Sequence, residues 1–239
     1  MIKILLAMRR SPSLSQKAFV DRYQKEYIPL LIKHYRSQIG CIFDLVDHRT
    51  LNPNHMGPNF NRSPYDGITA LYFRELDEFL SYYASQKQNE HLMAQEERLL
   101  SETHGYHLEE VVHWDNLKAR TEGVTSPGFK IIPFSCRNPQ LSREEFAEHY
   151  RNVHSSLARE HHPGIGRYVQ NFVQAALSAD APEIDAFAEL HFPSFEDYRD
   201  RFYARAESPR IIGKDVASFS DLTKLHYLTT IEIIIKKQF

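Results

Sequence analysis

The sequence predicts an α+β fold made of two copies of one unit, and the first observation behind this prediction is an internal repeat. Eight residues recur at a constant offset of 127 positions, without a gap. They are Arg10, Pro12, Leu14, Ser15, Phe19, Tyr23, Leu30 and His34, which match Arg137, Pro139, Leu141, Ser142, Phe146, Tyr150, Leu157 and His161. Chance would supply roughly one or two identities in a window of this length. The sequence therefore indicates a duplication.

The second observation is that both copies show the same order of predicted elements. Strands are predicted at 2–8, 41–48, 67–73 and 106–114 in the first copy, and at 129–135, 167–174, 184–192 and 227–235 in the second. One helix follows the first strand of each copy, and a second helix is predicted from 76 to about 101 and from 194 to about 224. The order β-α-β-β-α-β is that of a ferredoxin-like unit. A longer loop in the first copy, 51–65, is rich in Asn, Pro and Gly and predicts irregular structure.

The first helix of each copy has a predicted start and an apolar face. Ser15 and Ser142 occupy the N-cap position, and Glu145 completes a capping box in the second copy. Residues spaced by three or four then share one helical face. They are Phe19, Tyr23, Tyr27, Leu30 and His34 in the first copy, and Phe146, Tyr150, His154, Leu157 and His161 in the second.

We assign residues 1–118 to the first repeat, 119–128 to a linker and 129–239 to the second repeat. A unit of this size leaves one sheet face uncovered by its two helices, and an apolar sheet face has to find a partner. Two fused copies can stack these faces. The prediction is therefore an intramolecular α+β barrel, a pseudo-dimer within one chain, to which further self-association can add.

Composition excludes several classes of protein. A net charge of −2 and an isoelectric point near 6.7 argue against a nucleic-acid partner. No apolar run is long enough to cross a membrane, and the apolar stretch at the start is too short for a signal peptide. Cys41 and Cys136 lack metal or redox spacing, which favours a reducing, cytoplasmic location. No histidine cluster has zinc-ligand spacing, so no metal is expected, and no phosphate loop, nucleophile elbow or dinucleotide motif is found.

Two segments carry a family resemblance. The helix 141–154, with its Leu-Ser…Phe…Tyr…His pattern, and the strand 166–171 resemble the EthD family of dimeric α+β-barrel proteins. The strand 65–73 resembles the one that follows in that family, as does 184–192 more loosely. The resemblance implies a small cytosolic protein linked to breakdown of organic compounds or to aromatic polyketide maturation, with oxidoreductase-like or decarboxylase-like chemistry. The wider superfamily contains cofactor-free monooxygenases, isomerases and haem enzymes.

The helix histidine of the family corresponds to His154, while the first copy has Tyr27 in that register. An imidazole at this position can act as a general acid or base near neutral pH. The plainer interpretation is a partly buried histidine bonded to the backbone or to Tyr150. If the chemistry needs an imidazole, only the second copy can perform it.

Alternation along 184–192 places Asp185, Phe187, Glu189 and His191 on one face of the strand. Such a face can form a polar cavity wall in which the carboxylate pKa values are raised, or a solvated face at an opening of the barrel. In the first copy Asp66 occupies the position of Asp185, but Ala70 replaces Glu189 and Tyr72 replaces His191.

The resulting hypothesis is a cofactor-independent enzyme that acts on an aromatic or other hydrophobic carbonyl compound. His154 is the expected acid or base, with Asp185 or Glu189 orienting the imidazole or polarising water. Tyrosines suit a flat aromatic substrate, although ordinary core packing explains each of them as well. The expected substrate-binding residues are Tyr150, Tyr168, Phe146, His191, Tyr23 and Tyr27. The alternatives are a non-catalytic carrier of a hydrophobic metabolite and a haem protein with His154 as axial ligand.

Overall fold

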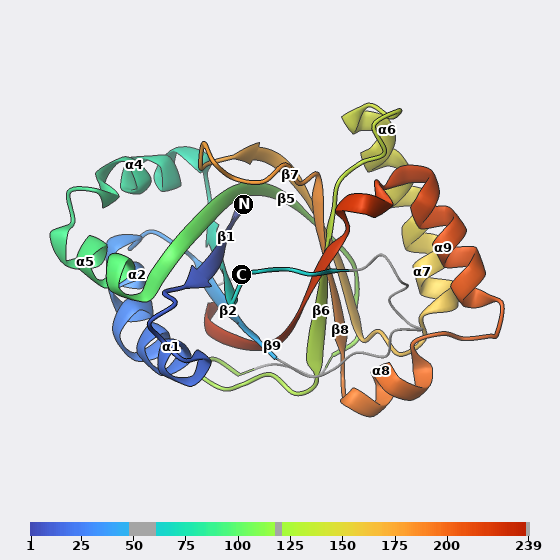
Figure 1. The fold of residues 1–239 in the computed structure, drawn as a ribbon, viewed down its shortest axis with the longest axis horizontal. Coiled ribbons are helices and arrows are strands. Elements are labelled where there is room, and N and C mark those ends of the chain that lie inside the picture. Colours follow the sequence, from blue (N-terminus) through green and yellow to red (C-terminus); the bar gives the residue numbers. More distant parts are fainter. Residues whose placement is uncertain (48–60, 118–120, 238–239) are drawn as a thin grey trace.

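The computed structural model describes residues 1–47, 61–117 and 121–237. The first half contributes the strands β1 (Ile2–Arg10), β2 (Gly40–Val46), β4 (Gly67–Phe73) and β5 (Leu100–Asp115), and the second half β6 (Phe129–Ser135), β7 (Arg167–Ala176), β8 (Ala186–Phe192) and β9 (His226–Lys237). These strands are neighbours in the order β2-β4-β1-β5-β7-β8-β6-β9, and β9 pairs with β2. The sheet is thus a closed antiparallel barrel (Figure 1). The short strand β3 (Asn61–Arg62) pairs in parallel with β9.

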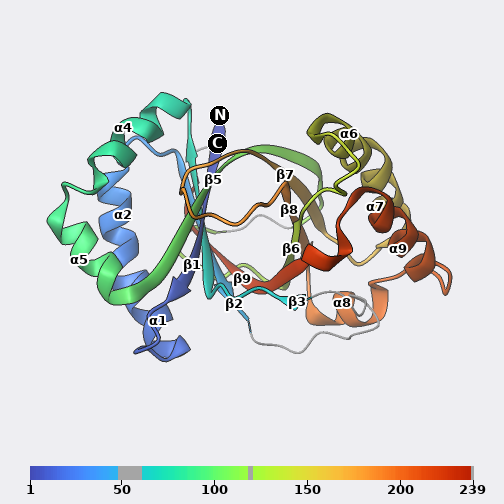
Figure 2. The same cartoon turned by 45° about the horizontal axis from the view of Figure 1, so that its top comes forward.

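The helices cover the barrel on two opposite sides (Figures 1 and 2). One side carries α1 (Gln16–Arg22), α2 (Ile28–His34), α4 (Leu76–Gln86) and α5 (Glu90–Leu99), and the other α6 (Arg143–Glu148), α7 (Ser155–His161), α8 (Phe195–Arg201) and α9 (Ser208–Phe219). A short 3-10 turn, η3 (Leu222–Lys224), leads into β9. The predicted barrel within one chain is confirmed, because equivalent strands of the two halves occupy equivalent places in it. No helix of the described residues is long and apolar enough to cross a membrane.

The strands separate three regions of core. The outward strand faces pack under the helices in two aromatic-rich clusters, one in each half. The inward faces fill the barrel with apolar residues toward its ends, including Leu5, Phe134 and Phe187 at one end and Ile42 and Ile234 at the other. β4 is buried along its whole length and so is largely apolar on both faces.

The predicted N-caps are present in both halves. The Ser15 hydroxyl accepts a hydrogen bond from the Ala18 backbone N–H, and Ser142 accepts one from Glu145. The Glu145 carboxylate in turn accepts from the Ser142 N–H, so the capping box is confirmed. These bonds satisfy N–H groups that a helix start leaves without partners.

The predicted second helices were too long in both halves. The segment 76–101 is two helices, because Asn89 caps a new start by accepting from the Leu92 N–H, and β5 already begins at Leu100. The segment 194–224 likewise breaks between α8 and α9, where Pro209 takes an early position of the new helix. Helical periodicity continued across both breaks, so the cap residue and the proline were the informative signals. Most of the predicted loop 51–65, and His48 of the predicted strand, lie outside the described residues.

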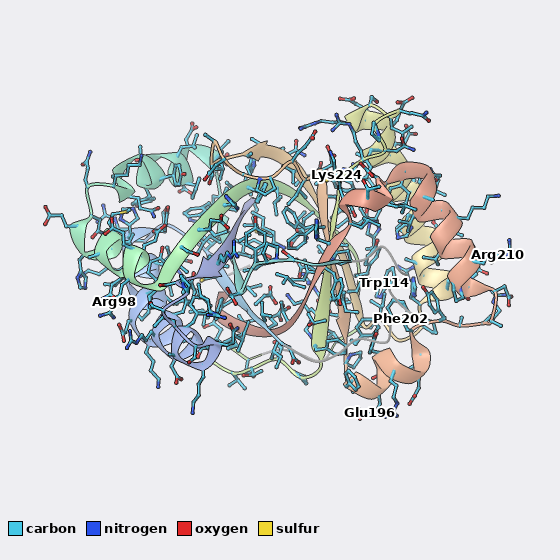
Figure 3. The ribbon with its side chains drawn as sticks, in the orientation of Figure 1. Arg98, Trp114, Glu196, Phe202, Arg210 and Lys224 are labelled. Carbon is cyan, nitrogen blue, oxygen red and sulfur yellow. The ribbon has the colours of Figure 1, made fainter. Side chains whose placement is uncertain are left out.

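The two halves are interlocked by their last strands. The first part of β5 pairs with β1 and its last part with β7, so Val111 and Trp114 pack into the aromatic core of the second half. Figure 3 shows Trp114 on the side of the barrel that carries the second half's helices. In return, Leu177 and Ile235 from the second half pack against the core of the first half. Each of the two aromatic-rich core clusters is therefore packed by residues from both halves.

Replacing Ser142 by alanine is expected to lower the free energy of unfolding by about 1 kcal/mol, because the Glu145 N–H loses its acceptor. Urea denaturation followed by circular dichroism would measure the change. Ser156→Ala is a suitable control, since its exposed hydroxyl only donates within the helix to the Asn152 carbonyl. An equal loss in both variants would contradict the role of the cap.

Candidate active site

A π-helical turn interrupts the first long helix at the same place in each half. In the second half it is η2 (His149–His154), between α6 and α7, and in the first half η1 (Tyr23–Tyr27), between α1 and α2. Turns of this kind inside α-helices are frequent at functional sites. The turn includes Tyr150 and His154 in the second half, and Tyr23 and Tyr27 at the matching positions of the first.

His154 forms a buried pair with Asp215 of α9. Its Nδ1 lies 2.7 Å from one carboxylate oxygen of Asp215, and the other oxygen lies 2.7 Å from Nε2 of His149. Burial alone would raise the pKa of Asp215, but the hydrogen bonds from His154 and His149 outweigh it and lower that pKa. Asp215 is therefore an anion at neutral pH and accepts the Nδ1 proton. Nε2 of His154 makes no hydrogen bond to any described residue, and 11% of the side chain is exposed.

Aromatic rings pack against this imidazole. The rings of Tyr150 and Phe219 lie 5.2 and 5.1 Å from that of His154, between centroids. The Tyr150 phenol is buried, which raises its pKa to about 12, and it interacts by hydrogen bonding with Tyr168 and Ser135. Burial likewise raises the pKa of Tyr168, so both phenols stay protonated and can donate to an oxygen atom.

A second histidine reaches the cluster from β5. Nε2 of His113 lies 2.9 Å from the amide oxygen of Gln170, whose NH₂ group donates to the Tyr150 carbonyl and the Tyr168 hydroxyl. Because the NH₂ group of Gln170 donates elsewhere, its amide oxygen accepts from His113, so Nε2 of His113 carries the proton. Burial lowers the pKa of His113, although its hydrogen bond with Gln170 opposes this change. His113 is therefore neutral, and it comes from the first half of the chain.

The sequence did not single out Asp215, His113 or Gln170. Asp215 matches Glu96 at the same offset of 119 that relates Asp185 to Asp66, so a search for carboxylates repeated at that offset would have found it. No local pattern marks His113, because it reaches the site only through the pairing of β5 with β7.

The equivalent place in the first half is a closed hydrogen-bonded cluster. The Tyr27 hydroxyl donates to Glu96 at 2.9 Å, as His154 does to the matching Asp215. The Tyr23 hydroxyl lies 3.0 Å from that of Thr69, and the Gln86 amide also donates to Glu96. Burial raises the pKa of Glu96. Tyr23 and Tyr27 are fully buried here and form part of the core.

Asp185 takes part in an ion pair that both halves repeat. It accepts from the guanidinium of Arg137 at 2.7 Å and from the Arg137 N–H at 2.8 Å. Asp66 and Arg10 form the same two contacts in the first half, at 3.1 and 3.0 Å. The repeated pair thus links the end of β1 to the start of β4 in the first half, and the end of β6 to the start of β8 in the second. Asp185 does not contact His154; Asp215 does.

Glu189 and His191 face the barrel interior, whereas Ala186, Ala188 and Phe192 face the helices. The predicted alternation is confirmed, and the sheet lies between this face and His154. Both side chains are buried, so the suggested solvated face at a barrel opening is wrong. Nε2 of His191 lies 3.1 Å from the Pro127 carbonyl.

Glu189 is surrounded by three cations. Its carboxylate accepts from Lys3 at 2.5 Å, from Lys130 at 3.1 Å and from Arg167 at 3.0 Å. Burial alone would raise the pKa of Glu189, but Lys130, Lys3 and Arg167 outweigh it and hold that pKa well below 4.5. The predicted rise of this carboxylate's pKa is therefore wrong, because the cations come from other strands.

The remaining charges inside the barrel follow the repeat. Lys3 pairs with Glu110 at 2.6 Å, and the equivalent Lys130 pairs with Glu232 at 2.6 Å. Lys130 also lies 2.9 Å from Asp44, whose pKa burial raises to about 6 even though Lys130 opposes the rise. The first half has Ala70 where the second has Glu189. The Glu189 carboxylate therefore pairs with cations from both halves of the chain.

A cavity of about 200 Å³ opens beside Tyr150, between α6 and the strands β5 and β7. Its lining residues are Glu109, Arg143, Glu144, Phe146, Ala147, Phe172, Val173, Gln174 and Asp185. Phe146 and Phe172 both contact the Tyr150 ring, at 5.6 and 6.0 Å between centroids. Tyr150 therefore stands between this cavity and His154, which does not line it.

Haem with His154 as its ligand would need open space beside Nε2. The rings of Tyr150 and Phe219 pack directly on the imidazole. The pairing of Nδ1 with a carboxylate would suit a metal-bound histidine, whereas the two rings packed on the imidazole restrict the space around it.

Comparison with known proteins agrees with the fold. The structure resembles that of an anthrone oxidase-like protein, with a TM-score of 0.65 and 11% identity over 100% of this chain and 94% of that one. It also resembles a dye-decolorizing peroxidase from Bacteroides thetaiotaomicron, with a TM-score of 0.53 and 8% identity over 97% and 92% of the two chains. At such identities the likeness shows the fold alone. Among curated proteins, no sequence matches this chain.

A family model matches both halves. The EthD domain is found at residues 11–103 and 138–223, so each match includes the helix with the π-helical turn and the strands that follow it. Together the two matches cover most of the sequence. The chain therefore belongs to the EthD domain family, with two copies fused into one barrel.

Proposed function

We propose that this chain is a cofactor-independent enzyme that uses His154 to move a proton on a hydrophobic or aromatic carbonyl compound. The observation that carries the proposal is the His154–Asp215 pair, in which the carboxylate holds the Nδ1 proton and leaves Nε2 without a partner among the described residues. A histidine arranged in this way has a defined tautomer and a basic Nε2. An oxidoreductase-like role agrees with the names of the structural neighbours.

In the proposed reaction, Nε2 of His154 takes a proton from a carbon next to a carbonyl or from a phenol. The substrate becomes an enolate or phenolate, and the imidazolium that forms is stabilised by the Asp215 carboxylate. The Tyr150 and Tyr168 hydroxyls would donate to the negative oxygen. With dioxygen as co-substrate, a methylene becomes a carbonyl, one oxygen atom entering the substrate and the other leaving as water. Decarboxylation or isomerisation through the same anion needs no oxidant.

The substrate would enter through the cavity lined by Phe146 and Phe172 and reach Nε2 when the Tyr150 ring turns aside. Only the second half offers this chemistry, because the first half has Tyr27 and Glu96 in place of His154 and Asp215. We further propose that residues 1–118 and 129–239 are ferredoxin-like repeats joined by 119–128. The equal strand order of the two halves supports this division.

The test is a panel of anthrones, phenols and β-keto acids, assayed by product chromatography and by oxygen uptake. We expect conversion by the wild type and its loss in His154→Gln, with binding retained. Trp114 is the only tryptophan and lies 4.9 Å from the Tyr168 ring, so its fluorescence reports binding independently of turnover. Conversion that persists in His154→Gln would remove this residue from the mechanism. Ligands that bind but are never converted would favour the carrier alternative.

A further inference from the structure

A second cavity lies in the first half, on the outer side of the helices and far from the barrel interior. It measures about 380 Å³ and opens between α2, α4 and the start of α5. Its lining residues are Leu30, Lys33, His34, Arg36, Tyr82, Ser85, Asn89 and His91. None of these lining residues is acidic, although the whole protein carries a net charge of −2.

Two cations of this cavity have no carboxylate partner among the described residues. Lys33 is exposed and makes no ion pair there. The Arg36 Nε donates to the Tyr82 hydroxyl at 3.3 Å, which leaves the outer nitrogens of its guanidinium without partners and the Tyr82 proton available. His91, at the start of α5, is exposed as well. The cavity therefore presents hydrogen-bond donors and positive charge to whatever fills it.

His34 forms one wall of the cavity. Its Nε2 lies 2.9 Å from the Tyr82 carbonyl, which can only accept, so Nε2 carries the proton. Nδ1 then accepts from the Asn89 amide at 3.3 Å. Asn89 also caps α5 through the Leu92 N–H. These bonds hold α2, α4 and α5 together. The backbone that carries Lys33 and Arg36 is therefore fixed relative to the other walls of the cavity.

The matching place in the second half carries different charges, with Arg201 at the position of Tyr82. At the matching offset of 127, Glu160 replaces Lys33 and Pro163 replaces Arg36, and Glu160 pairs with Arg205. His161 contacts Ser208 there, as His34 contacts Asn89. Lys33 and Arg36 are therefore not required by the fold, because their counterparts in the second half are not cations.

We propose that this cavity binds a small dianion, either a phosphate ester or a dicarboxylate. Lys33 supplies a mobile charge and Arg36 a planar fork that matches either group, while Tyr82 adds a hydroxyl donor. Leu30 and the rings of Tyr82 and His34 provide an apolar surface for the organic part of the ligand. The site is independent of His154 and of the function proposed above.

Calorimetric titration of the full chain with inorganic phosphate and with malonate, at low ionic strength, tests the proposal. We expect saturable binding of one anion per chain. Lys33→Glu copies the second half and should weaken binding about tenfold or more, the worth of a charge-assisted hydrogen bond. Lys17→Glu makes the same charge change on an exposed face of α1, outside the cavity, and should leave the affinity within about twofold.

The two probes separate the ligand classes. Stronger binding of phosphate identifies a phosphate ester, and stronger binding of malonate identifies a dicarboxylate. Absence of saturable binding of either anion would overturn the proposal, as would equal weakening by Lys17→Glu and Lys33→Glu. Both lysines are exposed, so both variants should keep the wild-type melting curve, and His154→Gln should bind either anion unchanged.

Discussion

Replacing Glu189 by glutamine is expected to lower the free energy of unfolding by about 3–5 kcal/mol at neutral pH, the usual cost of removing one partner from a buried ion pair. The carboxylate accepts from Lys3, Lys130 and Arg167, all of which are buried inside the barrel. A neutral amide would face these cations with less charge and with NH₂ protons that none of them can accept. The three strands that carry the cations would lose their common partner.

The loss should depend on pH. Because the pKa of Glu189 is held well below its ordinary value of 4.5, the folded state binds this proton less readily than the unfolded state does. The stabilisation by the carboxylate is therefore fully present above about pH 4.5 and disappears as pH falls through the folded-state pKa. The difference between wild type and Glu189→Gln should shrink in acid.

Guanidinium denaturation at pH 7 and in stepped acidic buffers would measure both effects. Glu183→Gln serves as the control, because that side chain is 60% exposed and makes only ion pairs of 3.7 and 3.8 Å. Exposed pairs contribute about 0–1 kcal/mol. A neutral-pH loss below about 1 kcal/mol in Glu189→Gln would show that the cations are satisfied by Glu110, Asp44 and Glu232 alone.

Asp215→Asn is expected to lower kcat by about 10²-fold in any reaction that uses His154 as a base, with a small effect on substrate binding. An asparagine can offer its oxygen to only one of the two histidines and must present its NH₂ group to the other. His154 then no longer has a fixed Nδ1 proton, so the fraction with a basic Nε2 falls. The charge that stabilises the imidazolium is lost as well.

The matched control is His149→Gln, which removes the other partner of the same carboxylate. His149 is 30% exposed and lies at the beginning of the π-helical turn, so this variant should change kcat by less than about threefold. Both variants should be compared by steady-state kinetics on a substrate found in the panel. Equal kcat values for wild type and Asp215→Asn would show that the carboxylate does not orient a catalytic imidazole.

The repeat explains which residues of the two halves serve the framework. Arg10 with Asp66 and Arg137 with Asp185 form the same pair, and Lys3 with Glu110 repeats as Lys130 with Glu232. The halves differ where chemistry is proposed. Each half still places a hydrogen-bond donor of its π-helical turn against a carboxylate of its last α-helix, which is α5 in the first half and α9 in the second. The difference is that the first half uses a phenol there and the second an imidazole.

By itself the sequence determined the features that depend on local patterns. The capping box at Ser142, the alternation along β8 and the shared face of Tyr150 and His154 follow from spacing within a few residues. The duplication follows from a constant offset of 127 residues between similar segments. The barrel was predicted from the sheet face that each copy leaves uncovered, and the family resemblance implied the same fold. The breaks at Asn89 and near Pro209 were missed because helical periodicity continues across them.

Only the tertiary structure decided which partner each functional group has. In the folded protein, Glu189 faces the barrel interior, on the other side of the sheet from His154. His154 pairs with Asp215, which lies 61 residues further along the chain, and His113 reaches the site from the first half. These outcomes depend on strand order, barrel closure and the angle at which α9 meets the π-helical turn. They are set by packing between distant segments, so no pattern within a single segment of the sequence contains them.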